Sequence, residues 1–123
     1  MSEKEKLIEM ASSSLSDAKV VKEESDRLFW NSIYYSLFYG AKAALKVYGA
    51  EPKSHSGADS QLGKIFYKEE KLLTADEASF YSDIRRIREE IDYEPYTSIT
   101  REKDETLRKA EELLTKLNEI AET

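Results

Sequence analysis

The spacing of the apolar residues constrains the fold of this chain most strongly, because it follows the period of an α-helix almost from end to end. Only two prolines and four glycines occur in the 123 residues, and we expect them at the junctions between helical segments. No segment shows the alternation of a strand, and no internal repeat is present. The clearest helical runs are Leu7, Ala11, Leu15, Ala18; Phe80, Ile84, Ile87, Ile91; and Leu107, Ala110, Leu114, Leu117, Ala121.

Capping signals indicate where the helices begin and end. Ser2 and Thr74 are each followed three residues later by a glutamate, which is the capping-box pattern of a helix N-terminus. Gly49, with a proline soon after it, is a stop signal for the second helix, and Thr100 is placed to cap the last one. A shorter apolar patch around Phe66 indicates a small third helix. We therefore expect an all-α protein: one domain, residues 1–123, forming an antiparallel up-and-down bundle of four long helices and one short helix.

The amino-acid composition argues against several classes of function. Cysteine is absent, and no pair of Glu-x-x-His motifs exists, so the sequence predicts neither a metal site nor a cofactor, and a ferritin-like di-iron bundle is excluded on ligand count. The net charge of -6 argues against a broad surface for nucleic acid and leaves room only for a focal contact with a phosphate. No run is long and apolar enough for a signal peptide or a membrane span, so we expect a cytoplasmic protein without membrane contact.

Two tyrosines of the second helix stand apart from its apolar side. Tyr35 and Tyr39 project from nearly the opposite side to residues such as Trp30 and Leu37, next to Lys42. They indicate either a surface for self-association or a partner, or two tyrosines that lie partly exposed on the helix.

The densest charge lies in residues 85–96, "RRIREEIDYEPY". On a helix Arg88 lies at the edge of the isoleucine stripe, where its stem can pack while its guanidinium reaches outward. Arg88 can pair with Asp92, and Arg85 with Glu89, at i,i+4 spacing. These are ordinary solvated pairs unless Arg88 faces a ligand. His55, the only histidine, is predicted in the loop before the third helix, as a hydrogen bonder of the turn or as a ligand-binding group.

Three stretches in order resemble the HEPN superfamily: "NSIYYSLFYGAKAALKVYG", "PKSHSG" and "REEIDY". The resemblance is to its branch of small UPF0332-like proteins and spans residues 31–93. It implies a helical bundle that forms a homodimer and is paired with a minimal nucleotidyltransferase in a toxin–antitoxin system. It also implies a nucleotide or an RNA phosphate as the ligand.

The resemblance implies a site as well. In relatives that are RNases, an arginine and a histidine on one helix bind the scissile phosphate and move protons. Arg88 matches the arginine, but Asp92 and Tyr93 follow it, and Tyr39 stands where a histidine is frequent in the second helix. An aspartate is a poor proton carrier near neutral pH, because its ordinary pKa is about 3.9. The expected function is therefore a dimeric binding module without catalysis.

The phosphate-binding candidates of this module are Asn31, Arg85, Arg88 and His55. One alternative is a metal-independent endoribonuclease with a degenerate Arg-x-x-x-Asp-Tyr site, formed by Arg88, Asp92 and Tyr93, with His55 as another proton carrier. A second alternative is a helical scaffold without a ligand. The family also implies a tyrosine that the nucleotidyltransferase modifies with AMP, and Tyr93 and Tyr96 are the candidates; Tyr93 could equally cover the helix end.

Overall fold

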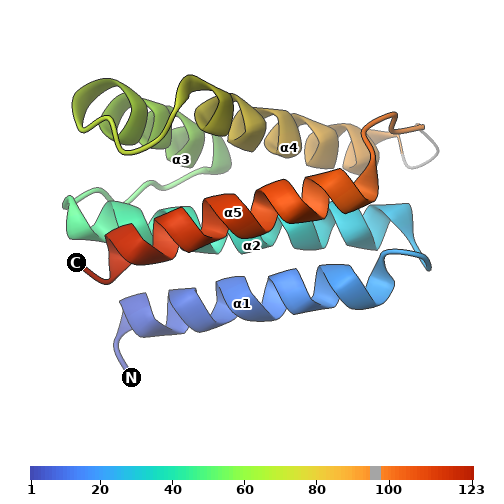
Figure 1. Cartoon of the computed structure of the whole chain (residues 1–123), viewed down its shortest axis with the longest axis horizontal. Helices are drawn as coiled ribbons and strands as arrows, with labels where there is room; N and C mark the ends of the chain where they lie inside the picture. Colours follow the sequence, from blue (N-terminus) through green and yellow to red (C-terminus); the bar gives the residue numbers. More distant parts are fainter. Residues whose placement is uncertain (95–97) are drawn as a thin grey trace.

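The computed structural model describes residues 1–94 and 98–123, and in them five α-helices form an antiparallel bundle (Figure 1). The helices are α1 (Glu3–Val21), α2 (Asp26–Val47), α3 (His55–Leu62), α4 (Ala75–Tyr93) and α5 (Lys103–Ala121), and a π-helical segment, η1 (Gly63–Glu69), continues α3. The four long helices alternate in direction along the chain. The predicted fold class is confirmed, including its one short helix.

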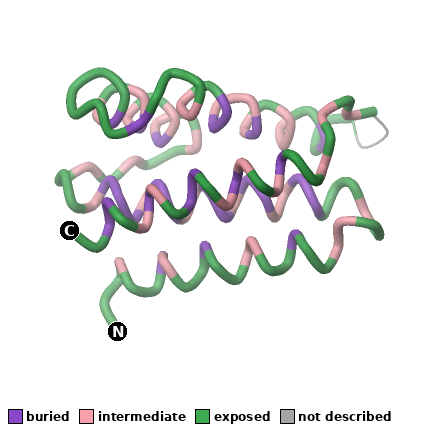
Figure 2. Tube along the Cα trace, viewed as in Figure 1, coloured by how far each residue is buried: buried purple, intermediate pink, exposed green. Residues whose placement is uncertain are grey.

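α2 is the central helix of the bundle, because it packs against α1, α3, α4 and α5. Its sequence is the most apolar of the five, which fits a helix surrounded by others. Figure 2 shows the buried residues gathered on the sides of the helices that face one another. The largest fully buried side chains are Phe29, Trp30, Tyr34, Phe66 and Tyr81. Within the described residues no helix is long and apolar enough to cross a membrane.

The expectation that the glycines lie at segment junctions is wrong for Gly40, which lies within α2 and lets α5 approach that helix closely. A Cβ on Gly40 would lie 2.6 Å from Cδ1 of Leu114 and 3.5 Å from Cδ1 of Leu117. Both leucines are buried in the core that α2 and α5 share. The close contact of the two helices therefore depends on the missing side chain at position 40.

Both predicted capping boxes are present. Ser2 Oγ accepts from the Glu5 amide at 3.1 Å, and Thr74 Oγ1 accepts from the Glu77 amide at 3.1 Å. In each box the glutamate carboxylate also accepts from the amide of the cap residue. The predicted cap at Thr100 is wrong, because α5 begins at Lys103. Lys103 Nζ donates to the Lys22 carbonyl at 2.6 Å, so a contact with the end of α1 accompanies the start of α5.

The prediction that His55 lies in a loop is also wrong. Ser54 is the N-cap of α3, since its Oγ accepts from the Gly57 amide at 2.9 Å, and His55 is the first helical residue. The cap fixes the direction in which α3 leaves the preceding loop. His55 consequently sits on a defined helix end.

Gly49→Ala is expected to lower the free energy of unfolding by about 1 kcal/mol. Gly49 ends α2 with φ of 73° and bonds the Lys46 carbonyl, while the Ala50 amide bonds the Leu45 carbonyl, which is a Schellman motif. An alanine strains this left-handed conformation even though the space around it is open. Urea unfolding followed by circular dichroism measures the change.

Gly63→Ala is the matched control. Gly63 also has open space around it, but its φ of -64° is helical, so alanine there is expected to be neutral or to stabilise the fold. Equal effects of the two substitutions would contradict the role given to Gly49.

Candidate functional site

Arg88 extends from α4 onto two tyrosine rings of α2. Its Cζ lies 5.6 Å from the ring centre of Tyr34 and 5.4 Å from that of Tyr35, and Nη2 donates to the Tyr35 hydroxyl at 3.1 Å. The side chain is 19% exposed. Its Nε is buried without a hydrogen bond from the described residues, and Asp92 Oδ2, 3.3 Å away, is not aligned for one. A guanidinium has five N–H donors, and Arg88 uses one of them in a hydrogen bond to the residues that the structure describes.

His55 reaches the same tyrosine rings from α3. Its Nδ1 lies 2.7 Å from the Tyr34 hydroxyl, a hydrogen bond in which either group can donate. The imidazole centre lies 4.5 Å from the ring centre of Phe38 and 5.9 Å from that of Tyr35. Burial, and then the positive charge of Arg88, lowers the pKa of His55 below its ordinary value of 6.5. His55 is therefore mostly neutral near pH 7. We call Tyr34, Tyr35, Phe38, His55 and Arg88 the Arg88 cluster.

Asp59 joins α3 to α4 and so positions His55, which lies one turn before it. Asp59 Oδ1 accepts from Ser82 Oγ at 2.6 Å, and Oδ2 accepts from Arg85 Nε at 2.7 Å. Arg85 also donates to Glu89 at 2.8 Å, as its i,i+4 spacing predicts. The Asp59 carboxylate raises the pKa of Arg85 above its ordinary value. These bonds occupy Arg85, and a ligand-binding role for it stays a prediction.

Asp92 and Tyr93, which follow Arg88 on α4, are not part of the Arg88 cluster. Asp92 pairs with Arg88, as predicted, and its Oδ1 also lies 3.7 Å from Arg27 Nε. Tyr93, the last residue of α4, is 91% exposed and does not cover the helix end. Asn31 donates to the Arg27 carbonyl at 2.9 Å and has no hydrogen bond to Arg88 or Asp92. Tyr96 lies outside the described residues.

Tyr35 and Tyr39 are less exposed than their place on the helix suggests. Both are half-buried against the core of their own chain, with ring centres 5.6 Å apart, and Tyr39 also lines a groove beside α1. Packing of α1 and α4 on either side of α2 accounts for this cover. A partner surface at Tyr35 and Tyr39 stays a prediction.

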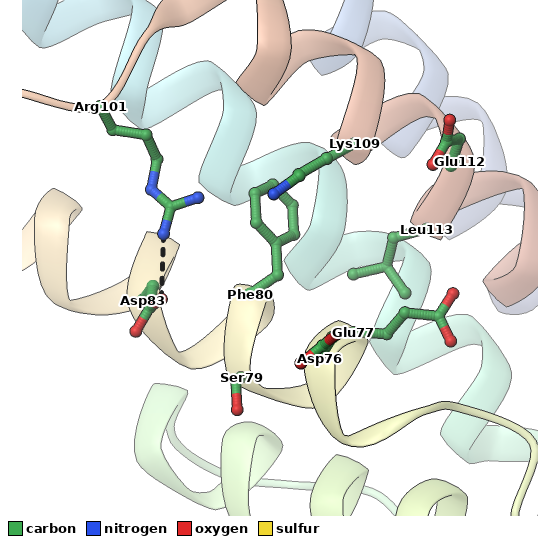
Figure 3. Close-up of a pocket in the computed structure, with 9 residues that line it drawn as sticks. All are labelled: Asp76, Glu77, Ser79, Phe80, Asp83, Arg101, Lys109, Glu112 and Leu113. Carbon is green, nitrogen blue, oxygen red and sulfur yellow. Dashed lines mark hydrogen bonds and ion pairs between the residues drawn. The ribbon is translucent and has the colours of Figure 1, made fainter.

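A separate groove of about 480 Å³ lies between α4 and α5, and no predicted site residue lines it (Figure 3). The Arg101 guanidinium lies 5.5 Å from the Phe80 ring centre and donates to Asp83 at 3.0 Å. Lys109 is paired with Glu105 of the preceding turn. The groove's two cations are thus paired with protein carboxylates, as Arg88 is with Asp92, but Arg88 differs in having a buried Nε without a hydrogen bond from the described residues.

Sequence reasoning missed Tyr34 and Asp59 as parts of the site. Tyr34 is buried in α2 like Trp30 and Leu37, but its hydroxyl reaches His55. Asp59 belongs to a stretch interpreted as loop. A signal was present in Ser54, since serine is one of the residues preferred at a helix N-cap.

A profile of the HEPN domain matches residues 4–123. The chain belongs to the HEPN family. This HEPN chain is similar to "Putative toxin MJ0142" of Methanocaldococcus jannaschii, with 33% identity over 106 residues that cover 85% of the chain and 71% of that protein. It is also similar to a protein named UPF0332 of Thermotoga maritima, with 33% identity over 128 residues that cover 99% and 96% of the two proteins.

The comparisons confirm the family and the branch that the three motifs predicted. They cover the segments that form the Arg88 cluster, since the HEPN match includes α2, α3 and α4. The cluster is thus formed within the HEPN domain itself.

Proposed function

We propose that this HEPN protein is a toxin-like binding module that holds a phosphate of RNA or of a nucleotide at Arg88. The observation that supports the proposal is a partly buried guanidinium with one hydrogen bond from the described residues. A phosphate can accept two parallel bonds from such a group, and Arg is well suited to this geometry. The low dielectric of an aromatic surrounding strengthens the attraction.

Asp92 is the internal competitor of such a phosphate. Its carboxylate lies beside Arg88, but it is exposed and also close to Arg27, so it can move toward Arg27 when an anion approaches. A phosphate between Arg27 and Arg88 would be bound more strongly by the two arginines than the single carboxylate of Asp92 is. Asp92 then sets the affinity instead of carrying out catalysis.

The toxin-like role draws on the relative from Methanocaldococcus jannaschii, whose name includes the word toxin. We place the protein in the cytoplasm as a homodimer that works with a minimal nucleotidyltransferase. The exposed Tyr93 suits modification by such a partner, because an active site can reach its hydroxyl at the end of α4. An added AMP group there would bring negative charge close to Asp92 and weaken phosphate binding.

The other two functions have less support. Cleavage by Arg88, Asp92 and Tyr93 alone requires a proton carrier, and Asp92 is paired with arginine while Tyr93 lies in solvent. A scaffold without a ligand gives no role to the buried Nε of Arg88, which has no hydrogen bond from the described residues.

Arg88→Ala is expected to weaken binding of a fluorescent single-stranded oligonucleotide by about 10- to 100-fold, because a charge-assisted contact is worth about 1.5–3 kcal/mol. Asp92→Asn is expected to tighten it. Fluorescence anisotropy at two salt concentrations measures both effects. The same titration with AMP distinguishes a nucleotide ligand from a polymer.

Arg108→Ala serves as the control, since Arg108 pairs with Glu112 of the same helix, is more than half exposed and does not belong to the Arg88 cluster. Binding that survives Arg88→Ala unchanged, with helicity intact, would exclude the proposed site.

A further inference from the structure

We propose that the groove between α4 and α5 binds a basic segment of a partner protein, with an apolar side chain on the groove floor and a lysine or arginine at Asp76. None of the residues of the Arg88 cluster lines this groove. The inference therefore does not rest on phosphate binding at Arg88.

The groove exists because two helices pack on a third and leave space between themselves. α4 and α5 both pack on α2 but make few contacts with each other. Glu77 of α4 is paired with Lys116 of α5 at 2.9 Å, and Asp83 of α4 is paired with Arg101, just before α5, at 3.0 Å. The groove extends between these ion pairs with a volume of about 480 Å³, within the range of about 300–1,000 Å³ that is usual for binding pockets.

The floor of the groove is apolar and already holds one cation of the protein itself. Phe80 and Leu113 line the floor and belong to the core, with only 7% and 2% of their surface exposed. The Arg101 guanidinium lies 5.5 Å from the Phe80 ring centre and donates to Asp83. A basic side chain of a partner can likewise lie with its apolar stem on this floor and its charged end on a carboxylate.

The opposite end of the groove offers a carboxylate for a second cation. In Figure 3 Arg101 lies on one side of Phe80 and Glu112 on the other, and Asp76 lies next to Glu77. Asp76 is exposed in the first turn of α4 and makes no hydrogen bond or ion pair with a described residue. Its charge is therefore available to a partner.

The charges of the groove favour a basic partner over the alternatives. Four carboxylates and two cations line the groove, and the whole chain has a net charge of -6. This field attracts a basic segment to the groove and repels a nucleic acid, an acidic peptide or a second copy of the chain. An uncharged segment would remove water from the Asp76 carboxylate without giving it a partner. The occupant is thus a segment with a basic residue next to an apolar one.

The test measures the binding of three fluorescein-labelled peptides of equal length by fluorescence anisotropy. The first peptide repeats Lys-Leu-Ala-Lys, the second has serine in place of leucine, and the third has glutamate in place of lysine. We expect the first to bind at least about 10-fold more tightly than the others, because it alone supplies both the charge and the apolar side chain. A higher salt concentration is expected to weaken this binding.

Ser79→Arg obstructs the groove without a change in the core. Ser79 lines the groove and is exposed on α4, where arginine is a better helix former than serine. The added charge is expected to weaken binding of the Lys-Leu-Ala-Lys peptide by about 10-fold or more, because like charges then meet at the groove. Asp76→Asn is expected to weaken it by about 2- to 5-fold, as for the loss of an exposed ion pair.

Ser12→Arg is the matched control, since Ser12 is exposed on α1 and does not line the groove. This substitution changes the net charge by the same amount as Ser79→Arg, and it is expected to leave peptide binding almost unchanged. Circular dichroism checks that every variant keeps its helices.

Several results would overturn the proposal. Absence of binding of the Lys-Leu-Ala-Lys peptide would do so directly. Equal weakening by Ser79→Arg and Ser12→Arg would mean that net charge alone attracts the peptide, and equal binding of the leucine and serine peptides would exclude a role for the apolar floor. Self-association that only Ser79→Arg abolishes, measured by analytical ultracentrifugation, would assign the groove to a second copy of the chain. None of these results bears on Arg88, because the peptides carry no phosphate.

Discussion

Leu117→Ala is expected to lower the free energy of unfolding by about 3 kcal/mol, within the usual range for a fully buried leucine. Leu117 has no exposed surface and lies against Gly40, whose place on α2 offers no side chain that could move into the void. A cavity that cannot collapse keeps its full cost, because the lining atoms lose their contacts. Urea unfolding, monitored by circular dichroism, measures the loss.

Leu28→Ala is the control for this prediction. Leu28 lies near the start of α2 and is 51% exposed, so the same substitution removes far less buried surface and is expected to cost under about 1 kcal/mol. A loss at Leu117 no greater than that at Leu28 would mean that α2 and α5 close the void. The close packing at Gly40 would then not be rigid.

The helices could be predicted from sequence because their signals are local. The apolar period and the two capping boxes involve residues within one or two turns, and the structure contains both boxes. The start of α5 could not be predicted, because Lys103 contacts the distant Lys22 carbonyl. The start of α3 was missed because Ser54 lies in a stretch rich in turn formers, whose composition outweighed its capping pattern.

The same distinction between local signals and contacts distant in sequence applies to the candidate site. The pairs of Arg88 with Asp92 and Arg85 with Glu89 follow from i,i+4 spacing on one helix, and both were predicted. The contact of Arg88 with Tyr35 depends on how α4 crosses α2, which periodicity does not specify. The bond of His55 to Tyr34 depends in addition on the docking of α3. A single sequence contains no local sign of either contact.

Asp59→Ala is expected to lower the free energy of unfolding by about 2–3 kcal/mol and to loosen α3 from α4. Asp59 is 13% exposed and accepts bonds from Ser82 and Arg85, so its removal leaves a partly buried guanidinium and a hydroxyl without this partner. Urea unfolding measures the stability. Amide hydrogen exchange in α3 measures how firmly α3 is docked on α4. We expect exchange to increase more in α3 than in α1, because the lost hydrogen bonds join α3 to α4 and do not involve α1.

Glu112→Ala is the matched control, because it breaks an ion pair, Arg108–Glu112, that is about as short as Arg85–Asp59 but more exposed. Arg108 and Glu112 are joined at 2.8 Å, close to the 2.7 Å between Arg85 and Asp59, but both side chains are more than half exposed. An exposed i,i+4 pair is worth about 0.3–0.5 kcal/mol, so its loss is expected to be small. Equal losses in the two variants would mean that water already screens the Asp59 pair. The position of His55 over Tyr34 would then have to depend on the Ser54 cap and the packing of Phe66, not on this ion pair.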